Sequence, residues 1–159
     1  MLIDNEFTVA QPVEKVWEFF GNIPQVALCL PGAELTEDLG DGAYQGKVGI
    51  SMGPVKMAFD GAAKILQRDD ASKTMVIDGA GADQKGRGNA KLLLTAKLLP
   101  AAQGGTTVSM QQDIQLSGAA AQYGRGMISD VSAVLMGQFA TNMQERIAAI
   151  ESGADLSKL

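Results

Sequence analysis

The chain has 159 residues, of which 46% are hydrophobic and 19% charged, a composition typical of a folded domain and not of a disordered chain. Its net charge of −5 argues against a nucleic-acid-binding protein and against a polybasic anchor on anionic lipid. The sequence contains no histidine, the commonest general base and metal ligand, and its one cysteine, Cys29, excludes an internal disulfide. No signal-peptide pattern and no apolar stretch of about 20 residues is present, so we expect a soluble, cytoplasmic protein.

Residues 2–10 predict a first strand. Two short helices are predicted next. The first follows Pro12 and places Trp17 on its apolar face, because proline suits the first turn of a helix. The second has Pro24 near its start and stops at residues 31–32.

After Gly32 the apolar residues recur at every second position, which is typical of strands with one buried face. The alternation predicts strands over residues 44–52, 55–65, 75–79, 92–98 and 108–116, with turns at 53–54, 68–72, 79–88 and 100–105. Short turns between consecutive strands indicate an antiparallel meander.

From about Ala119 the period returns to 3.6, which predicts a helix of roughly thirty residues. Its apolar stripe consists of Ile128, Val131, Leu135, Phe139, Met143, Ile147 and Ile150. This helix is the one predicted element large enough to cover the apolar face of the sheet. We therefore expect a single domain over residues 1–150 and a C-terminal tail over 151–159.

The inward face of the predicted sheet carries several small residues, Gly46, Gly61, Ala63 and Gly79. Protein cores pack at nearly crystalline density, so small residues in a row leave space for another occupant or a bulky neighbour. The large residues of the same face, which include Met52, Met57, Phe59, Met75 and Met110, fit either a ligand cavity or an ordinary core. The pattern alone leaves both interpretations open.

Gln112 occupies an inward position on the last strand. A buried amide costs about 1–3 kcal/mol unless it is hydrogen-bonded. It therefore contacts either a ligand carbonyl or hydroxyl, or a neighbouring backbone group or water.

Cys29 has apolar neighbours and no histidine to activate it, which indicates a small buried hydrophobe and not a nucleophile. The glycine pairs at 79–81 and 86–88 precede a strand and not a helix, which argues against a phosphate-binding loop.

Several short motifs follow one another over about residues 2–145. They are Pro12-Val-x-x-Val16-Trp17, Cys29-Leu-Pro31-Gly32-Ala-Glu34, Gly46-x-Val48-x-Ile50-x-x-Gly53-Pro54, Phe59-x-Gly61, Gly79-x-Gly81-x-Asp83, Gly86-x-Gly88-x-Ala90, Gly105-Thr106, Gly118 and Tyr123-Gly124. The ordered set resembles the CoxG family, the G subunits of carbon monoxide dehydrogenase, which is part of the START-like (SRPBCC) superfamily.

The resemblance implies an α+β helix-grip (START-like) fold. A curved antiparallel sheet of about seven strands would surround a long C-terminal helix, with two short helices after the first strand. It also implies that the turns near residues 51–54, 83–86 and 123–125 form the mouth of a cavity. Some members carry a longer C-terminal extension thought to touch the membrane, and we expect this chain, which ends at Leu159, to lack it.

In function, the resemblance implies a non-catalytic accessory protein of carbon monoxide dehydrogenase or a related molybdenum hydroxylase. Such a protein would bind an apolar quinone or lipid-like ligand and link the enzyme to the membrane, with peripheral contact at the inner membrane face. We expect no metal and no covalently bound cofactor. The candidate ligand-binding residues are Val48, Met52, Met57, Phe59, Met75, Leu94, Met110, Gln112, Tyr123, Met127 and Val131.

Two other functions remain open at this point. One is an assembly or maturation factor with a filled core, which would act through protein contacts and bind no ligand. The other is an enzyme, since the superfamily contains cyclases and dehydratases. The missing histidine and the scattered carboxylates argue against catalysis.

Overall fold

The structure is a computed structural model that describes residues 1–155, apart from the side chain of Met52. Its elements are β1 (Leu2–Val9), α1 (Val13–Phe20), α2 (Ile23–Cys29), β2 (Ala33–Gly40), β3 (Ala43–Met52), β4 (Val55–Asp69), β5 (Thr74–Asp83), β6 (Gly88–Pro100), the 3₁₀ turn η1 (Ala102–Gly104), β7 (Thr106–Gly118), the 3₁₀ turn η2 (Ala119–Gln122) and α3 (Arg125–Ser152). The predicted order of a strand, two short helices, a run of strands and a long helix is confirmed, and β2 is a further strand for which the alternation gave no range.

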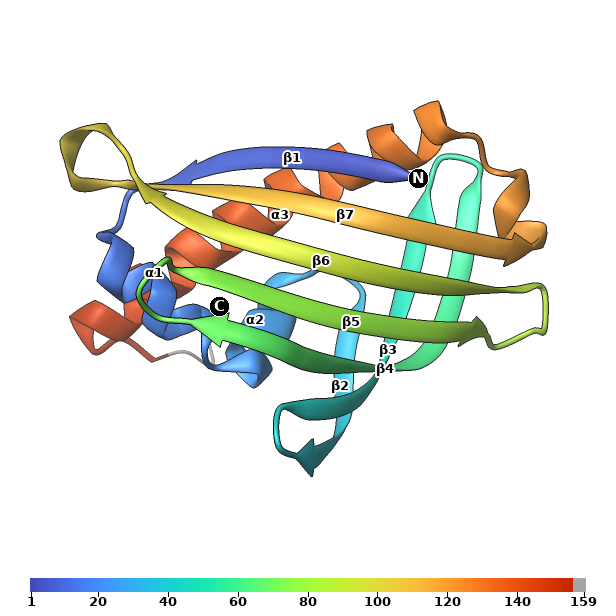
Figure 1. Cartoon of the computed structure of the whole chain (residues 1–159), viewed down its shortest axis with the longest axis horizontal. Coiled ribbons are helices and arrows are strands. Elements are labelled where there is room, and N and C mark those ends of the chain that lie inside the picture. Colours follow the sequence, from blue (N-terminus) through green and yellow to red (C-terminus); the bar gives the residue numbers. More distant parts are fainter. Residues whose placement is uncertain (156–159) are drawn as a thin grey trace.

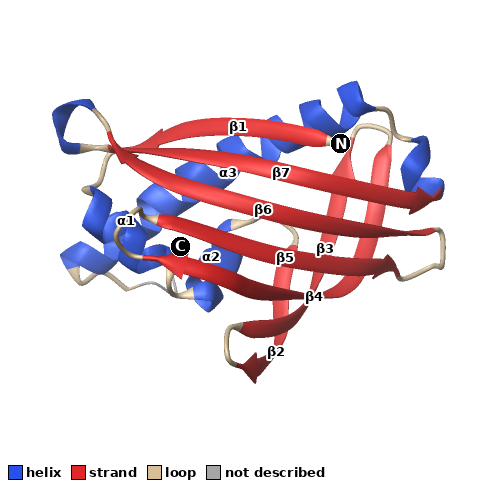
Figure 2. Ribbon diagram, viewed as in Figure 1, coloured by secondary structure: helices blue, strands red, loops and turns tan. Residues whose placement is uncertain are grey.

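The seven strands form one antiparallel sheet in the order β1-β7-β6-β5-β4-β3-β2. The N-terminal strand β1 pairs with β7, so the first and last strands of the chain are neighbours. The sheet curves strongly, so that β2 and β3 cross the direction of β5, β6 and β7, while α3 runs behind the β1 side of the sheet (Figure 1). Figure 2 shows the same arrangement by element type, with all three helices on one side of the sheet.

Local sequence signals set the boundaries of the short helices. Pro12 precedes α1 with a φ of −62°, the value that its ring imposes. Asn22 caps α2 by accepting a hydrogen bond from the backbone N–H of Gln25 at 3.4 Å, and Pro24 follows it in the first turn.

The predicted turn over residues 79–88 is wrong in its first half. Strand β5 continues through Gly79 and Gly81 to Asp83, and the turn itself spans residues 84–87. Here Gly81 lies opposite Gly61 where the two strands approach closely, and it does not change the direction of the chain. A Cβ atom built on Gly61, the partner of Gly81, would lie 2.1 Å from the carbonyl oxygen of Ala80.

The long helix also differs from its predicted limits. Residues 119–122 form a 3₁₀ turn, and α3 begins at Arg125 and ends at Ser152. The left-handed conformation of Gly153, with a φ of 71°, ends the helix. Residues 151–152 of the predicted tail are therefore helical, and residues 156–159 lie outside the described part of the chain.

Two hydrophobic clusters support the sheet from inside. The larger joins α1, α2, the C-terminal half of α3 and the adjacent strand ends. Within it, the ring centroid of Phe139 lies 6.0 Å from that of Phe7 and 6.3 Å from that of Phe20. The smaller cluster is built on Val55, Met57 and Ala120, near the turns at the other end of β4 and β7.

Candidate ligand-binding cavity

Small residues are aligned across the middle of the sheet. The strand register places Gly46 of β3 beside Gly61 of β4, Gly61 beside Gly81 of β5, and Gly81 beside Ala90 of β6. The neighbouring inward row runs through Tyr44, Ala63, Gly79, Leu92 and Ile114. These two rows are hereafter called the glycine rows. Four strands present hydrogen or methyl groups along them, at Gly46, Gly61, Ala63, Gly79, Gly81 and Ala90, where larger side chains would fill the interior.

A cavity of about 380 Å³ lies against the glycine rows. This volume is at the lower end of the roughly 300–1,000 Å³ that small-molecule sites occupy. Its apolar wall is formed by Leu30, Ala33 and Leu35 of the α2–β2 segment, Val48 and Ile50 of β3, Phe59 and Ala63 of β4, Ala90 and Leu92 of β6, and Ile114 of β7. Leu30 packs against the larger hydrophobic cluster, whereas Ile50 and Phe59 pack against the smaller one. The cavity therefore lies between the two clusters, and it is partly open to solvent.

One buried polar side chain, Gln112, reaches this wall among the described residues. It is 8% exposed, and its Nε2 donates a hydrogen bond to Oγ of Ser132 at 3.3 Å. Nδ2 of Asn5 donates to the same Oγ at 2.8 Å. The partner of Gln112 is thus a side chain of α3.

Asp83 holds the β5–β6 turn at the end of the sheet beside the cavity. Its buried carboxylate accepts hydrogen bonds from Nε and Nη2 of Arg87 at 2.8 and 3.1 Å, and from the backbone N–H of Arg87 at 3.0 Å. These bonds, with a further one from the backbone of Ala58, hold the pKa of Asp83 well below its ordinary value against the opposing effect of burial. A carboxylate fixed in this way supports the turn and is not poised to exchange protons.

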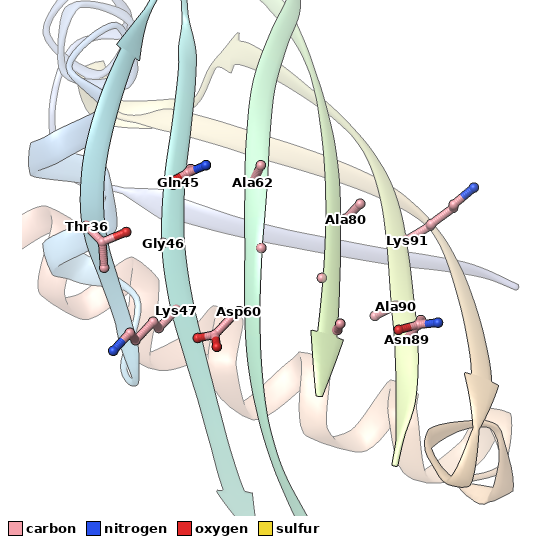
Figure 3. Close-up of a pocket in the computed structure, with 13 residues that line it drawn as sticks. Thr36, Gln45, Gly46, Lys47, Asp60, Ala62, Ala80, Asn89, Ala90 and Lys91 are labelled. Carbon is pink, nitrogen blue, oxygen red and sulfur yellow. The ribbon is translucent and has the colours of Figure 1, made fainter. Parts of the chain in front are cut away.

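The opposite face of the sheet is also hollowed behind the glycine rows. Figure 3 shows this outer groove, of about 660 Å³, with polar side chains such as Lys47, Asp60, Asn89 and Lys91 around it. Among the residues that line both the groove and the cavity are Gly46, Gly61, Gly81 and Ala90. Since these residues have little or no side chain, a single layer of backbone separates the two.

The family model for CoxG, the G subunit of carbon monoxide dehydrogenase, matches residues 6–148. The chain belongs to this CoxG family. No curated protein matches the sequence significantly.

Solved structures show the fold that the CoxG-family chain adopts. It is similar to a conserved protein from Geobacillus kaustophilus, with a TM-score of 0.82 and 20% identity over 93% of this chain and 95% of that one. It is also similar to the Zhui aromatase/cyclase from Streptomyces sp. R1128, with a TM-score of 0.66 and 13% identity over 98% and 99%. A START superfamily protein from Mycobacterium smegmatis gives a TM-score of 0.61 and 12% identity over 94% and 98%. The predicted helix-grip, START-like fold is confirmed.

Of the predicted ligand-binding residues, the structure places Val48, Phe59 and Gln112 on the cavity wall of the CoxG-family chain. The others lie around it. Met57 belongs to the smaller hydrophobic cluster, with Tyr123 and Val131 packed against it, while Met75 and Met110 belong to the larger one, with Leu94 packed against it. Met127 is 37% exposed, and the side chain of Met52 lies outside the described residues.

Several residues of the wall are not among those predicted from the sequence. Tyr44, Ile50, Leu92 and Ile114 lie on the inward face that the alternation predicted, so their periodicity could have identified them. Leu35 follows the two short helices, and no local pattern shows that its strand returns to the cavity.

Two further observations bear on the chemistry of the CoxG-family chain. Over residues 1–155, no group of three or more cysteine, aspartate or glutamate side chains is arranged to hold a metal ion. Within the same residues, no helix has both the length and the apolar character needed to cross a membrane.

Proposed function

We propose that this CoxG-family chain is a non-catalytic carrier that holds an apolar quinone or lipid-like molecule in its cavity. The carrier would serve carbon monoxide dehydrogenase or a related molybdenum hydroxylase and link it to the membrane. The observation that carries the proposal is the cavity of about 380 Å³ beneath the glycine rows.

The physical basis of the proposed affinity is burial of apolar surface. Each Å² of apolar surface removed from water contributes roughly 25 cal/mol, and the wall offers aliphatic and aromatic side chains on several strands. Glycine has no side chain that could rotate to fill the space, so the cavity persists without ligand. A volume of this size suits a ring system, and a long acyl or isoprenoid tail would extend through the open side.

The charged residues beside the cavity support a carrier more than an enzyme. Glu34, Lys47 and Lys91 border it, but their side chains are exposed. An acid or base that works on a bound substrate needs a perturbed environment near the reacting atoms. The polar side chain buried in the wall is the neutral amide of Gln112.

The family supports the proposed partner. The CoxG family takes its name from a subunit of carbon monoxide dehydrogenase, and a carrier of an apolar quinone would connect such an enzyme to the membrane. A protein that acts through surface contacts alone has no use for an internal hollow, so the cavity supports a carrier over an assembly factor without ligand.

The experiment is to fill the cavity from the sheet. A Cβ on Gly79 would find its nearest neighbours at 3.8 Å or beyond, so Gly79→Leu can extend a side chain into the cavity. Ala82→Leu is the matched control, because Ala82 lies exposed on the opposite face of β5. We expect the wild type and Ala82→Leu to bind 1,4-naphthoquinone in calorimetry, and Gly79→Leu to bind it at least about tenfold more weakly.

A wild-type protein that binds no naphthoquinone and yields no apolar molecule on solvent extraction contradicts the proposal. Equal affinity in Gly79→Leu and the wild type would show that the ligand binds elsewhere. Co-purification of Gly79→Leu with the dehydrogenase would show that docking does not depend on a ligand.

A further inference from the structure

Three polar side chains from three elements meet beside the cavity. Asn5 of β1 and Gln112 of β7 each donate an amide N–H to Oγ of Ser132 on α3, at 2.8 and 3.3 Å. Gln112 and Ser132 are both 8% exposed. The group lies where α3 crosses the β1–β7 edge of the sheet, and Gln112 is its member on the cavity wall.

Counting donors and acceptors shows what this group offers to a ligand. A serine oxygen has two acceptor positions, and the two amides use both. A side-chain amide is planar, with its oxygen and nitrogen on different sides. Since Nε2 of Gln112 faces Ser132, the Oε1 atom faces away from it. The atom of Gln112 left to the cavity is therefore a hydrogen-bond acceptor.

The other polar residues of the wall do not supply the same contact. The side chains of Glu34, Lys47 and Lys91 are exposed and keep their water. Tyr44 is only partly buried. A hydrogen bond discriminates most strongly where little water competes for it, and Gln112, only 8% exposed, is the most buried polar side chain of the wall.

We propose that Gln112 determines ligand specificity by accepting, through Oε1, a hydrogen bond from a hydroxyl or N–H group of the ligand. Ser132 and Asn5 are positioning residues that fix the amide in this orientation. The inference rests on the proposed function and deepens it: the cavity favours a hydroxylated ring over its carbonyl or ether counterpart, and thus a hydroquinone over a quinone.

The test compares two ligands that differ in one hydrogen-bond donor. The ring system of 1-naphthol and 1-methoxynaphthalene is the same, but the ether has no proton to give to Gln112. We expect calorimetry to show 1-naphthol binding about 3- to 10-fold more tightly to the wild type. In Gln112→Leu, which keeps a similar volume without the acceptor, we expect the ratio of affinities to fall to about one.

Ser132 is tested by the same ratio. In Ser132→Ala the amide is free to turn, so we expect the preference for 1-naphthol to weaken while the affinity for 1-methoxynaphthalene stays unchanged. Ser132→Thr retains the hydroxyl oxygen and should restore the preference. A purely structural role for Ser132 would change the melting temperature or both affinities together, and not their ratio.

The outcomes separate the inference from the proposed function. If the wild type binds both compounds equally, or if Gln112→Leu keeps the preference, the inference is wrong and the carrier proposal stands. The inference also fails if the protein binds 1,4-naphthoquinone but not 1-naphthol. If none of these compounds binds, the proposed function fails and the inference fails with it.

Discussion

Cys29 illustrates how burial decides the chemistry of a single residue. The thiol is fully buried at the end of α2, with Sγ 3.5 Å from the carbonyl oxygen of Gln25. Burial raises the pKa of Cys29 to about 11, although the nearby Arg146 acts in the opposite direction. Since the thiolate is the reactive form, the folded protein holds this cysteine inert at neutral pH.

We predict that Cys29 does not react with Ellman's reagent in the native protein at pH 8, whereas one thiol per chain reacts in guanidinium chloride. The absorbance of the thiolate that the reagent releases measures how many thiols have reacted. The raised pKa also means that the thiol form stabilises the fold below about pH 9, and that this contribution is lost as the pH rises towards about 11. Complete labelling of the native protein within minutes would contradict the prediction.

Asp83 is a buried carboxylate of the opposite kind, because Arg87 lowers its pKa below the ordinary 3.8. The charged form therefore stabilises the folded state above about pH 4, and this stability is lost as the pH falls below that value. We predict that Asp83→Asn lowers the melting temperature at pH 7 and that the difference from the wild type narrows below about pH 4. Asp78→Asn, at an exposed position of the same strand, is the control. A difference that is independent of pH would contradict this prediction.

Individual residues of the site could be predicted from the sequence only where they belong to the alternation of apolar and polar residues along a strand. Val48, Phe59 and Gln112 lie on the cavity wall because alternation puts them on the inward face. The contact of Asn5 with Ser132 joins positions 127 residues apart, and nothing in either local pattern indicates it. Long-range side-chain contacts depend on how α3 crosses the sheet.

At the scale of the elements, the glycine rows serve two different purposes. Gly61 and Gly46 lie so close to a neighbouring strand that a Cβ would come within 2.1 Å of the carbonyl oxygen of Ala80 and 2.7 Å of that of Glu34, respectively. Gly79 has ordinary van der Waals space around it. The first two glycines allow the strands to approach, whereas Gly79 leaves room for a ligand.

This difference predicts opposite results for two similar substitutions. Gly61→Ala forces backbone atoms of β4 and β5 apart, and overpacking of this kind destabilises by about 1–3 kcal/mol. Gly79→Ala meets no such contact, and replacing glycine within a strand should leave stability unchanged or raise it. Urea unfolding of both variants measures the difference. Equal destabilisation would show that Gly79 is also required for strand approach.

The order and type of the elements could be predicted because periods of two and 3.6 alternate clearly along the chain. The extent of β5 could not. Gly79-x-Gly81 has the composition of a turn, and the need for close strand approach is visible only when Gly61 lies opposite Gly81. The cavity itself could be anticipated in part, since Gly46, Gly61, Ala63 and Gly79 share one predicted face.

At the scale of the whole molecule, the C-terminal half of α3 contributes more buried apolar side chains than its N-terminal half. Phe139, Met143 and Ile147 are buried in the larger hydrophobic cluster. Towards the N-terminal end of α3, Arg125, Gly126, Met127 and Asp130 are exposed, and Val131 packs against the smaller cluster. Local stability follows buried apolar contact, so the N-terminal half should open more readily than the C-terminal half.

We predict that amide hydrogens of residues 128–132 exchange faster than those of residues 139–147, as measured by hydrogen-exchange mass spectrometry. Gly126→Ala tests the cause, because a Cβ there meets no atom within 4 Å and alanine favours a helix by about 1 kcal/mol over glycine. The variant should slow exchange about fivefold in residues 128–132 and leave residues 139–147 unchanged. Equal protection of both halves in the wild type would contradict this difference in local stability.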